Sequence, residues 1–190
     1  MKRAVAALAL LGWAVGVAAD PRAEFMSRLS QEAGLPPIAE NELRLWSFSF
    51  RTPRNFVIRL LETPRGAQGE LVLWWSREFA PNPDWHPRNL RCARHLAKLE
   101  LRLCRAVLNP EPDWTALLGD LAAYGVWKLP GDGKAAPAPH LSADVDSLVV
   151  EARRDGRVRS YAYGNSGELN AERILARAWS FVDQHVRGFR

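Results

Sequence analysis

The sequence predicts an α+β domain, an antiparallel sheet of about six strands with helices packed on one face. Three observations carry this prediction. Several segments alternate between apolar and polar residues, and turn-forming residues separate them. Helical patterns precede, interrupt and follow these segments. An Asp-Gly dipeptide, typical of a two-residue hairpin turn, joins the last two alternating segments.

The first expected elements are a short helix over residues 20–33 and a strand over residues 43–50. A capping Asp and a first-turn Pro suit the start of the helix, and a Gly followed by two prolines suits its end. The strand alternates up to Trp46, where the period slips by one residue and predicts a β-bulge. Two further strands are expected at residues 56–62 and 70–77, with a hairpin loop between them at residues 63–69.

The stretch from residue 89 to 108 fits both a helix and a strand. As a helix it presents an apolar stripe, and as a strand it alternates over residues 97–106. The two cysteines of the chain, Cys92 and Cys104, favour the strand. On one helix they would lie roughly 18 Å apart, too far for a disulfide. A loop or short helical turn up to about residue 95, followed by a strand, allows the bond.

Two helices and a hairpin are expected in the last third of the chain. Asp113 caps a helix over residues 114–124, and Gly125 closes it. Residues 131–143 are rich in Gly, Ala and Pro and predict a flexible loop. The two strands of the hairpin are expected at residues 146–153 and 157–163, and a long closing helix is expected at residues 168–187.

Residues 1–19 have the three parts of a cleavable signal peptide. A cationic start, Met-Lys-Arg, precedes an apolar run from Ala4 to Ala19 that ends in small residues. The run is short for a membrane span, which needs roughly 20 apolar residues. We therefore expect cleavage after Ala19, no membrane span in the mature chain, and a periplasmic or secreted protein.

The mature chain, residues 20–190, has the length of a single domain. Loss of Lys2 and Arg3 with the signal peptide lowers the formal net charge from +5 to +3. The arginines are scattered among acidic residues, so nucleic acid is not an expected partner. In an exported protein, Cys92 and Cys104 are expected to form a disulfide rather than remain free thiols or bind zinc.

The chain contains no motif of nucleophilic, cofactor-dependent or metal-dependent catalysis. We therefore predict no catalytic, cofactor-binding or metal-ligating residues. Tryptophan is the unusual feature, with seven in the mature chain. Trp74 and Trp75 are neighbours on a predicted strand and must point to opposite faces. Trp75 and Trp85, the latter in a Pro-rich stretch, are candidates for an exposed binding surface, whereas core packing is the more common role of tryptophan.

From Asp113 to the C-terminus the chain resembles uncharacterised exported bacterial proteins. The resemblance lies in the Trp-led helix, Gly-Val-Trp-Lys-Leu-Pro at 125–130, Val-Glu-Ala-Arg-Arg-Asp-Gly at 150–156, Tyr-Ala-Tyr-Gly-Asn at 161–165, and the last helix. It covers about residues 113–190. It implies a fold and an exported location, and it carries no activity, cofactor or site residue.

These observations favour an exported, non-catalytic protein that binds or inhibits another envelope protein, in the manner of an immunity protein or inhibitor. A module that binds cell wall or glycan through exposed tryptophans is the second hypothesis. An unrecognised periplasmic hydrolase is the third, and it requires a cleft with converging titratable groups.

Overall fold

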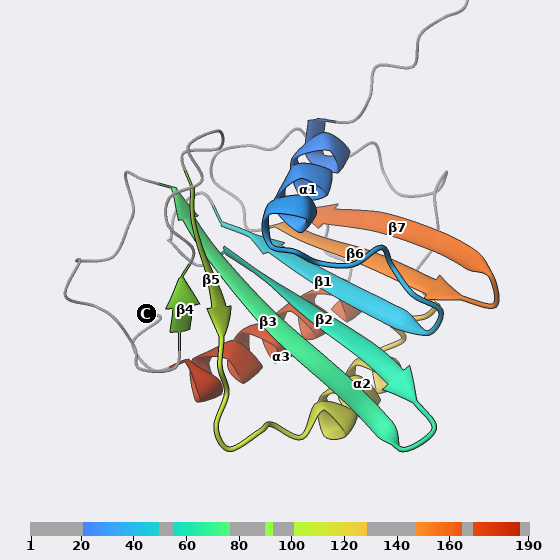
Figure 1. Ribbon diagram of the computed structural model, residues 1–190. Coiled ribbons are helices and arrows are strands. Elements are labelled where there is room, and N and C mark those ends of the chain that lie inside the picture. The colour runs from blue at the N-terminus through green and yellow to red at the C-terminus, as the bar shows by residue number, and fades with distance from the viewer. Residues whose placement is uncertain are drawn as a thin grey trace, which may run out of the picture.

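Within the residues that the structure describes, seven antiparallel strands form one sheet in the order β4-β5-β3-β2-β1-β6-β7 (Figure 1). The structure is a computed structural model, and it describes residues 21–49, 55–76, 90–92, 101–128, 147–164 and 169–186. The strands are β1 (Glu42–Phe48), β2 (Asn55–Thr63), β3 (Gly66–Ser76), β4 (Leu90–Cys92), β5 (Leu101–Ala106), β6 (Ser147–Arg154) and β7 (Arg157–Gly164). The helices are α1 (Pro21–Glu32), α2 (Trp114–Ala123) and α3 (Leu169–His185). The α+β class is confirmed, whereas the predicted signal peptide 1–19 and loop 131–143 lie outside the described residues.

Each face of the sheet builds its own hydrophobic core, because successive residues of a strand point to opposite sides. On one face, Leu43, Ile58 and Leu73 pack with α2 and α3. On the other face, Trp46 and Val72 join a smaller cluster that includes Met26 and Leu29 of α1. The expectation that all helices pack on one face is therefore right for α2 and α3 and wrong for α1, which Figure 1 shows on the opposite side of the sheet.

Strand β1 contains no bulge at Trp46, which corrects the sequence prediction. Its pairing with β2 and β6 is continuous, and Trp46 faces Val57 on one side and Val149 on the other. The apparent slip in the period arises because β1 is a central strand buried on both faces. Leu45 enters the core beneath α2 and α3, and Trp46 enters the cluster beneath α1.

The turn between β2 and β3 is tighter than the expected loop at residues 63–69. Thr63 and Gly66 are directly paired, so two residues connect the strands. The hydroxyl of Thr63 donates to the carbonyl of Gly66 at 2.8 Å, and the N–H of Ala67 donates to the hydroxyl of Thr115 at 2.8 Å. The hydrogen bond to Thr115 ties this hairpin to the first turn of α2.

The ambiguous stretch contains strands in its described parts. Residues 101–106 form β5, as predicted for the second half of the stretch. The expected loop or helical turn before residue 95 is wrong at residues 90–92, which form β4 and pair with β5. A three-residue edge strand is too short to leave a periodic signal, so the sequence did not predict it. The register places Cys92 directly opposite Cys104.

The last third of the chain matches its prediction closely. Asp113 caps α2 by accepting from the N–H of Ala116 at 2.8 Å, and Gly125 follows the helix with φ 81°. Asp155 and Gly156 connect β6 and β7 with positive φ angles of 54° and 71°. This conformation is typical of the two-residue turn that an Asp-Gly dipeptide favours.

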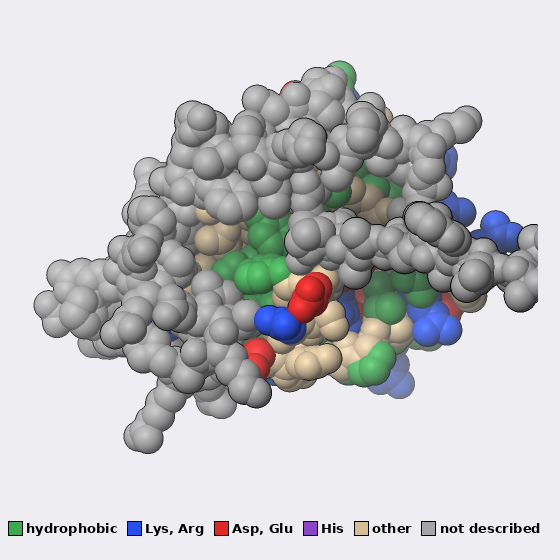
Figure 2. Space-filling view, turned by 90° about the horizontal axis from the view of Figure 1, so that it is seen from above, with side chains coloured by type: hydrophobic (Ala, Val, Ile, Leu, Met, Phe, Trp, Pro, Cys, Tyr) green, Lys and Arg blue, Asp and Glu red, His purple; other side chains and the backbone are tan. Residues whose placement is uncertain are grey.

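Loop residues between α1 and β1 are held by a buried network of charges on the α1 face. The carboxylate of Glu42, fully buried, accepts hydrogen bonds from Arg44 Nε at 2.7 Å and from Arg59 Nε at 2.9 Å. It also accepts from the N–H of Ala39 at 3.1 Å, and Arg44 donates to the carbonyl of Pro36. The view from above in Figure 2 shows acidic and basic side chains next to hydrophobic ones on the visible surface.

Candidate functional site

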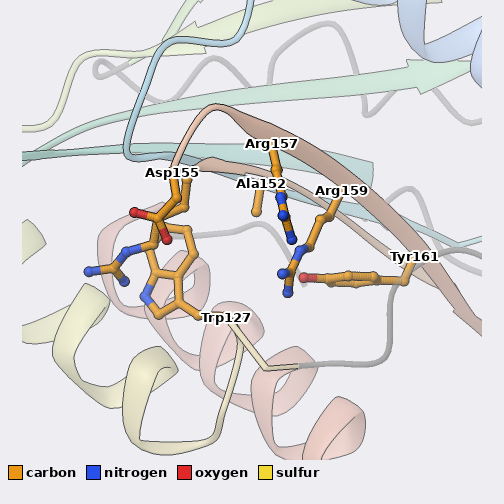
Figure 3. Close-up of a pocket in the computed structure, with 7 residues that line it drawn as sticks. Trp127, Ala152, Asp155, Arg157, Arg159 and Tyr161 are labelled. Atoms are coloured by element: carbon orange, nitrogen blue, oxygen red, sulfur yellow. The ribbon is translucent and has the colours of Figure 1, made fainter.

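The candidate site is a small pocket at the tip of the β6–β7 hairpin, on the same side of the sheet as α2 and α3. Its volume is about 70 Å³, enough for one small polar group. The pocket is lined by Trp127, Ala152, Arg154, Asp155, Arg157, Arg159 and Tyr161. The lining therefore combines three arginines, one carboxylate and two aromatic rings. In Figure 3 the side chains of Arg157 and Arg159 extend from β7 into the same space, with Tyr161 beside them.

The hairpin geometry gathers the arginines. Arg157, Arg159 and Tyr161 occupy alternate positions of β7, so their side chains share one face. Arg154 pairs with Arg157 across the two-residue turn, which places it on that same face. The carboxylate of Glu40 accepts from the N–H of Gly156 at 3.2 Å and holds the turn from outside the hairpin.

The aromatic wall is positioned by the chain that leaves α2. The hydroxyl of Tyr161 donates to the carbonyl of Val126 at 3.3 Å, within the buried core. The N–H of Val126 donates to the carbonyl of Leu121 at 3.1 Å, and Val126 itself is fully buried. These contacts fix the residue before Trp127, so the indole ring stands at the rim of the pocket.

The three arginines differ in their partners. The guanidinium of Arg154 lies 4.8 Å from the centre of the Trp127 ring, a cation–π contact. Arg154 also forms a long ion pair of 3.7 Å with Glu62, in which both side chains are more than 40% exposed. Arg157 and Arg159 are exposed, and no ion pair is found for them among the described residues. They are the cations available to a ligand.

Several arginines around a small pocket suit recognition of an anion. A guanidinium presents planar, directed N–H donors and keeps its charge at any physiological pH, so it binds carboxylate and phosphate groups well. Asp155 is the single acidic group among the lining residues. The lining contains no histidine, cysteine, serine or second carboxyl that could form a general acid–base pair with Asp155.

The buried charges around Glu42 form a second cluster, and it stabilises the fold. Burial raises the pKa of Glu42, but the hydrogen bonds from Arg59, Arg44 and Ala39 outweigh it, so the pKa of this carboxyl lies below its ordinary value. The hydrogen bond to Glu42 correspondingly raises the pKa of Arg59. Glu42 is fully buried, Arg44 is 4% exposed and the Arg59 side chain is 19% exposed, so this cluster offers little surface to a ligand.

A further carboxyl on the α1 face has the opposite electrostatic character. Glu151 of β6 accepts a hydrogen bond from Nε1 of Trp46 at 2.7 Å. Burial raises the pKa of Glu151, and the hydrogen bond from Trp46 and the charge of Arg44 offset this effect only in part. The two carboxyls, Glu42 and Glu151, are thus shifted in opposite directions although they lie on neighbouring strands.

The described candidates from the sequence, Trp75, Cys92 and Cys104, do not line this pocket. Trp75 is 2% exposed and belongs to the core beneath α2 and α3, so it is not the exposed binding residue that was expected. Trp74 is also 2% exposed, on the opposite face. Both faces of β3 are covered, which is why neither indole reaches the surface. Trp85 lies outside the described residues.

Cys104 is buried in the core, and the register of β4 and β5 places Cys92 opposite it. The described residues contain no free cysteine. They also contain no cluster of His, Cys, Asp or Glu that could hold a metal ion. Within the same ranges, no helix combines the length and the apolar character that crossing a bilayer needs.

Sequence reasoning missed Arg154, Arg157, Arg159 and Trp127 as site residues. The arginines looked scattered because they were counted along the whole chain. The available signal was local: the two arginines that follow the Asp-Gly turn have a spacing of two, and on a strand this spacing places them on one face. Comparisons with family models, curated proteins and solved structures find no match to this chain.

Proposed function

We propose that this chain is an exported, non-catalytic protein that binds another protein of the cell envelope, in the manner of an immunity protein or inhibitor. The arginine pocket, defined as the lining around Arg154, Arg157 and Arg159, is the recognition site in this proposal. It binds an acidic group of the partner, a side-chain or terminal carboxylate. The N-terminal signal peptide at residues 1–19 supports the location.

The observation that carries the proposal is the excess of positive charge at one hairpin tip. Three arginines and one aspartate line a pocket of about 70 Å³ whose wall is an indole ring. Charged groups in a protein interface contribute to partner choice and to association rate. An arginine held against an aromatic ring is also among the residue types that dominate binding energy in interfaces.

A disulfide between Cys92 and Cys104 forms part of the same proposal. Directly opposite residues of an antiparallel pair have Cα atoms about 5.5 Å or less apart, a distance that a disulfide can span. The register of β4 and β5 provides this arrangement. An oxidising compartment would preserve the bond.

Affinity capture tests the proposed function. The wild-type chain, the double variant Arg157→Glu/Arg159→Glu and the control Arg173→Glu are used as baits in envelope extract from the source cells. Arg173 is exposed on α3 and does not line the pocket. We expect one identified partner in stoichiometric amount with the wild type and the control, and its loss with the double variant. Equal recovery by all three baits, or no partner with any, overturns the proposal.

The glycan-binding alternative loses one of its two tryptophans, because Trp75 is buried. The observation that still favours a glycan is the half-buried Trp127 at the rim of the pocket. This alternative predicts that soluble peptidoglycan fragments change the tryptophan fluorescence of the wild type but not of Trp127→Leu. A flat titration of the wild type removes it.

A further inference from the structure

The strand that carries the arginines forms one edge of the sheet in the described part of the chain. β7 pairs with β6 and has no second neighbour in the strand order. It is eight residues long, whereas β4 at the opposite edge has three. A long edge strand presents a row of backbone N–H and C=O groups that another strand can pair with.

The hairpin register shows which backbone groups point outward. In a two-residue hairpin the flanking residues, here Arg154 and Arg157, form a hydrogen-bonded pair, and bonded and non-bonded pairs then alternate along the ladder. Arg157, Arg159 and Tyr161 therefore direct their N–H and C=O groups toward β6. Val158, Ser160 and Ala162 direct theirs away from β6, to the free side of the strand.

The side chains of β7 alternate between the two faces of the sheet. Arg157 and Arg159 lie on the pocket face, and Val158 lies between them on the other face, where it is 58% exposed. In a strand added beside β7, alternate side chains would come to lie next to these two arginines. The intervening side chains would lie next to Val158.

From this arrangement we propose that an extended acidic segment of the partner adds to β7 as a further strand. Its carboxylates at positions i and i+2 lie beside Arg157 and Arg159 on the pocket face, and its intervening apolar residues cover Val158. The backbone supplies hydrogen bonds to Val158 and Ser160, and the arginines select the sequence. This inference rests on the proposed function and specifies the chemistry and the binding mode of the partner.

Charge decides which strand can occupy this edge. A second copy of β7 would bring arginines opposite arginines, and like charges directly opposite one another destabilise a strand pair. A nucleic acid would satisfy the arginines but has no peptide backbone to pair with the outward N–H and C=O groups. An acidic polypeptide satisfies both features.

The test uses a capped peptide, Thr-Glu-Val-Glu-Val-Thr, and isothermal titration with the full exported chain. We expect binding that weakens about tenfold or more in Arg157→Glu/Arg159→Glu and is unchanged in Arg173→Glu. A peptide with Lys in place of both Glu residues should not bind. Two further peptides have the same sequence and carry methyl groups on alternate backbone nitrogens. In the second peptide the methylated nitrogens all lie along one edge of the extended strand, and in the third they lie along the opposite edge. One of them should bind about tenfold more weakly, because it loses donors to β7.

A substitution in β7 itself tests the same backbone pairing without a change to the peptide. Ser160→Pro removes one outward N–H and should weaken binding as N-methylation does, whereas Ser160→Ala should not. The methylated peptides keep the inference testable if Ser160→Pro does not fold, because they need only the wild-type chain.

The outcomes separate the two proposals. Binding that requires the arginines but tolerates both methylated peptides overturns strand addition and leaves the arginine pocket as the recognition site. Absence of peptide binding to the wild type overturns the inference, while the capture experiment decides the proposed function independently. Binding of oligothymidylate in place of the peptide, with the same dependence on Arg157 and Arg159, overturns both.

Discussion

The indole ring of Trp114 lies directly against the backbone of Gly69. A Cβ atom at position 69 would be 2.2 Å from ring atoms Cδ2 and Cε3 of Trp114, far inside van der Waals contact. The same indole packs against Phe181 of α3, with ring centres 5.0 Å apart. Because glycine has no side chain, the Trp114 ring can lie against strand β3 at position 69 while it also contacts α3.

We predict that Gly69→Ala lowers the free energy of unfolding by about 2 kcal/mol or more, because the ring or the strand must move. Urea denaturation followed by tryptophan fluorescence measures this change. The matched control is Gly119→Ala on the exposed side of α2, where an added Cβ meets nothing within 4 Å. The control should raise stability by up to about 1 kcal/mol, because alanine favours a helix over glycine.

A double-mutant cycle identifies the clashing partner. Trp114→Leu alone should destabilise the protein through lost packing, but adding Gly69→Ala to it should cost much less than in the wild type. Additive effects of the two substitutions would show that the strain at position 69 does not come from the Trp114 ring.

We predict that Glu42→Gln destabilises the protein by about 3 kcal/mol at neutral pH, because it removes the counter-charge of the buried Arg44 and one of the two carboxylates beside Arg59. The pKa of Glu42 is lowered from 4.5 in the folded state. Its stabilisation is therefore complete above that pH and is lost as the pH falls through the lowered folded value. The difference between wild type and variant should shrink on acidification, measured by urea denaturation at several pH values. A difference that stays constant or grows in acid contradicts the assignment.

Glu151→Gln should have the opposite pH dependence. The pKa of Glu151 is raised from 4.5, so its ionisation opposes folding as the pH rises above that value. Glutamine has no charge and still accepts the hydrogen bond from Trp46. We expect the variant to be more stable than the wild type at neutral pH and equal to it in acid. A loss of stability at neutral pH would show that the charge of Glu151 is needed.

We predict that the exported protein contains a Cys92–Cys104 bond. Intact mass with an alkylating agent should show no modification before reduction and two modifications after it. Reduction should lower the stability by about 3 kcal/mol, the entropic value for a short loop. Alkylation of the unfolded, unreduced protein would contradict the bond.

We predict that the same exported material begins at Asp20. Its mass should lack residues 1–19, because the small residues before Asp20 suit signal peptidase. A mass that includes residue 1 would indicate an uncleaved N-terminal segment and would contradict the predicted cleavage after Ala19.

Much of the fold could be predicted from local patterns. The helix capped by Asp113, the hairpin around Asp155 and Gly156, and the strand that contains Cys104 all agree with the structure. For the helix and the hairpin, the signal and the structure involve the same few neighbouring residues, whereas the strand was favoured over a helix because of the two cysteines. The short strand β4 and the position of α1 could not be predicted in this way, since both depend on partners distant in the sequence.

The candidate site is one of the features that depend on residues distant in the sequence. The spacing of Arg157 and Arg159 is a property of the sequence, but the pocket also needs Trp127, thirty residues earlier. The tryptophans show the same limit. The pattern requires Trp74 and Trp75 to face opposite ways, but only the packing of helices on both faces determines that both are buried.

The sequence by itself determined the α+β class, the final hairpin and the opposite orientations of neighbouring strand residues, because these follow from local periodicity and turn chemistry. Only the tertiary structure decided that α1 covers the second face, that Trp75 is a core residue, and that three arginines and one indole line the same pocket. The physical reason is that burial and charge clustering depend on which distant segments pack together, and the local backbone pattern carries no record of those contacts.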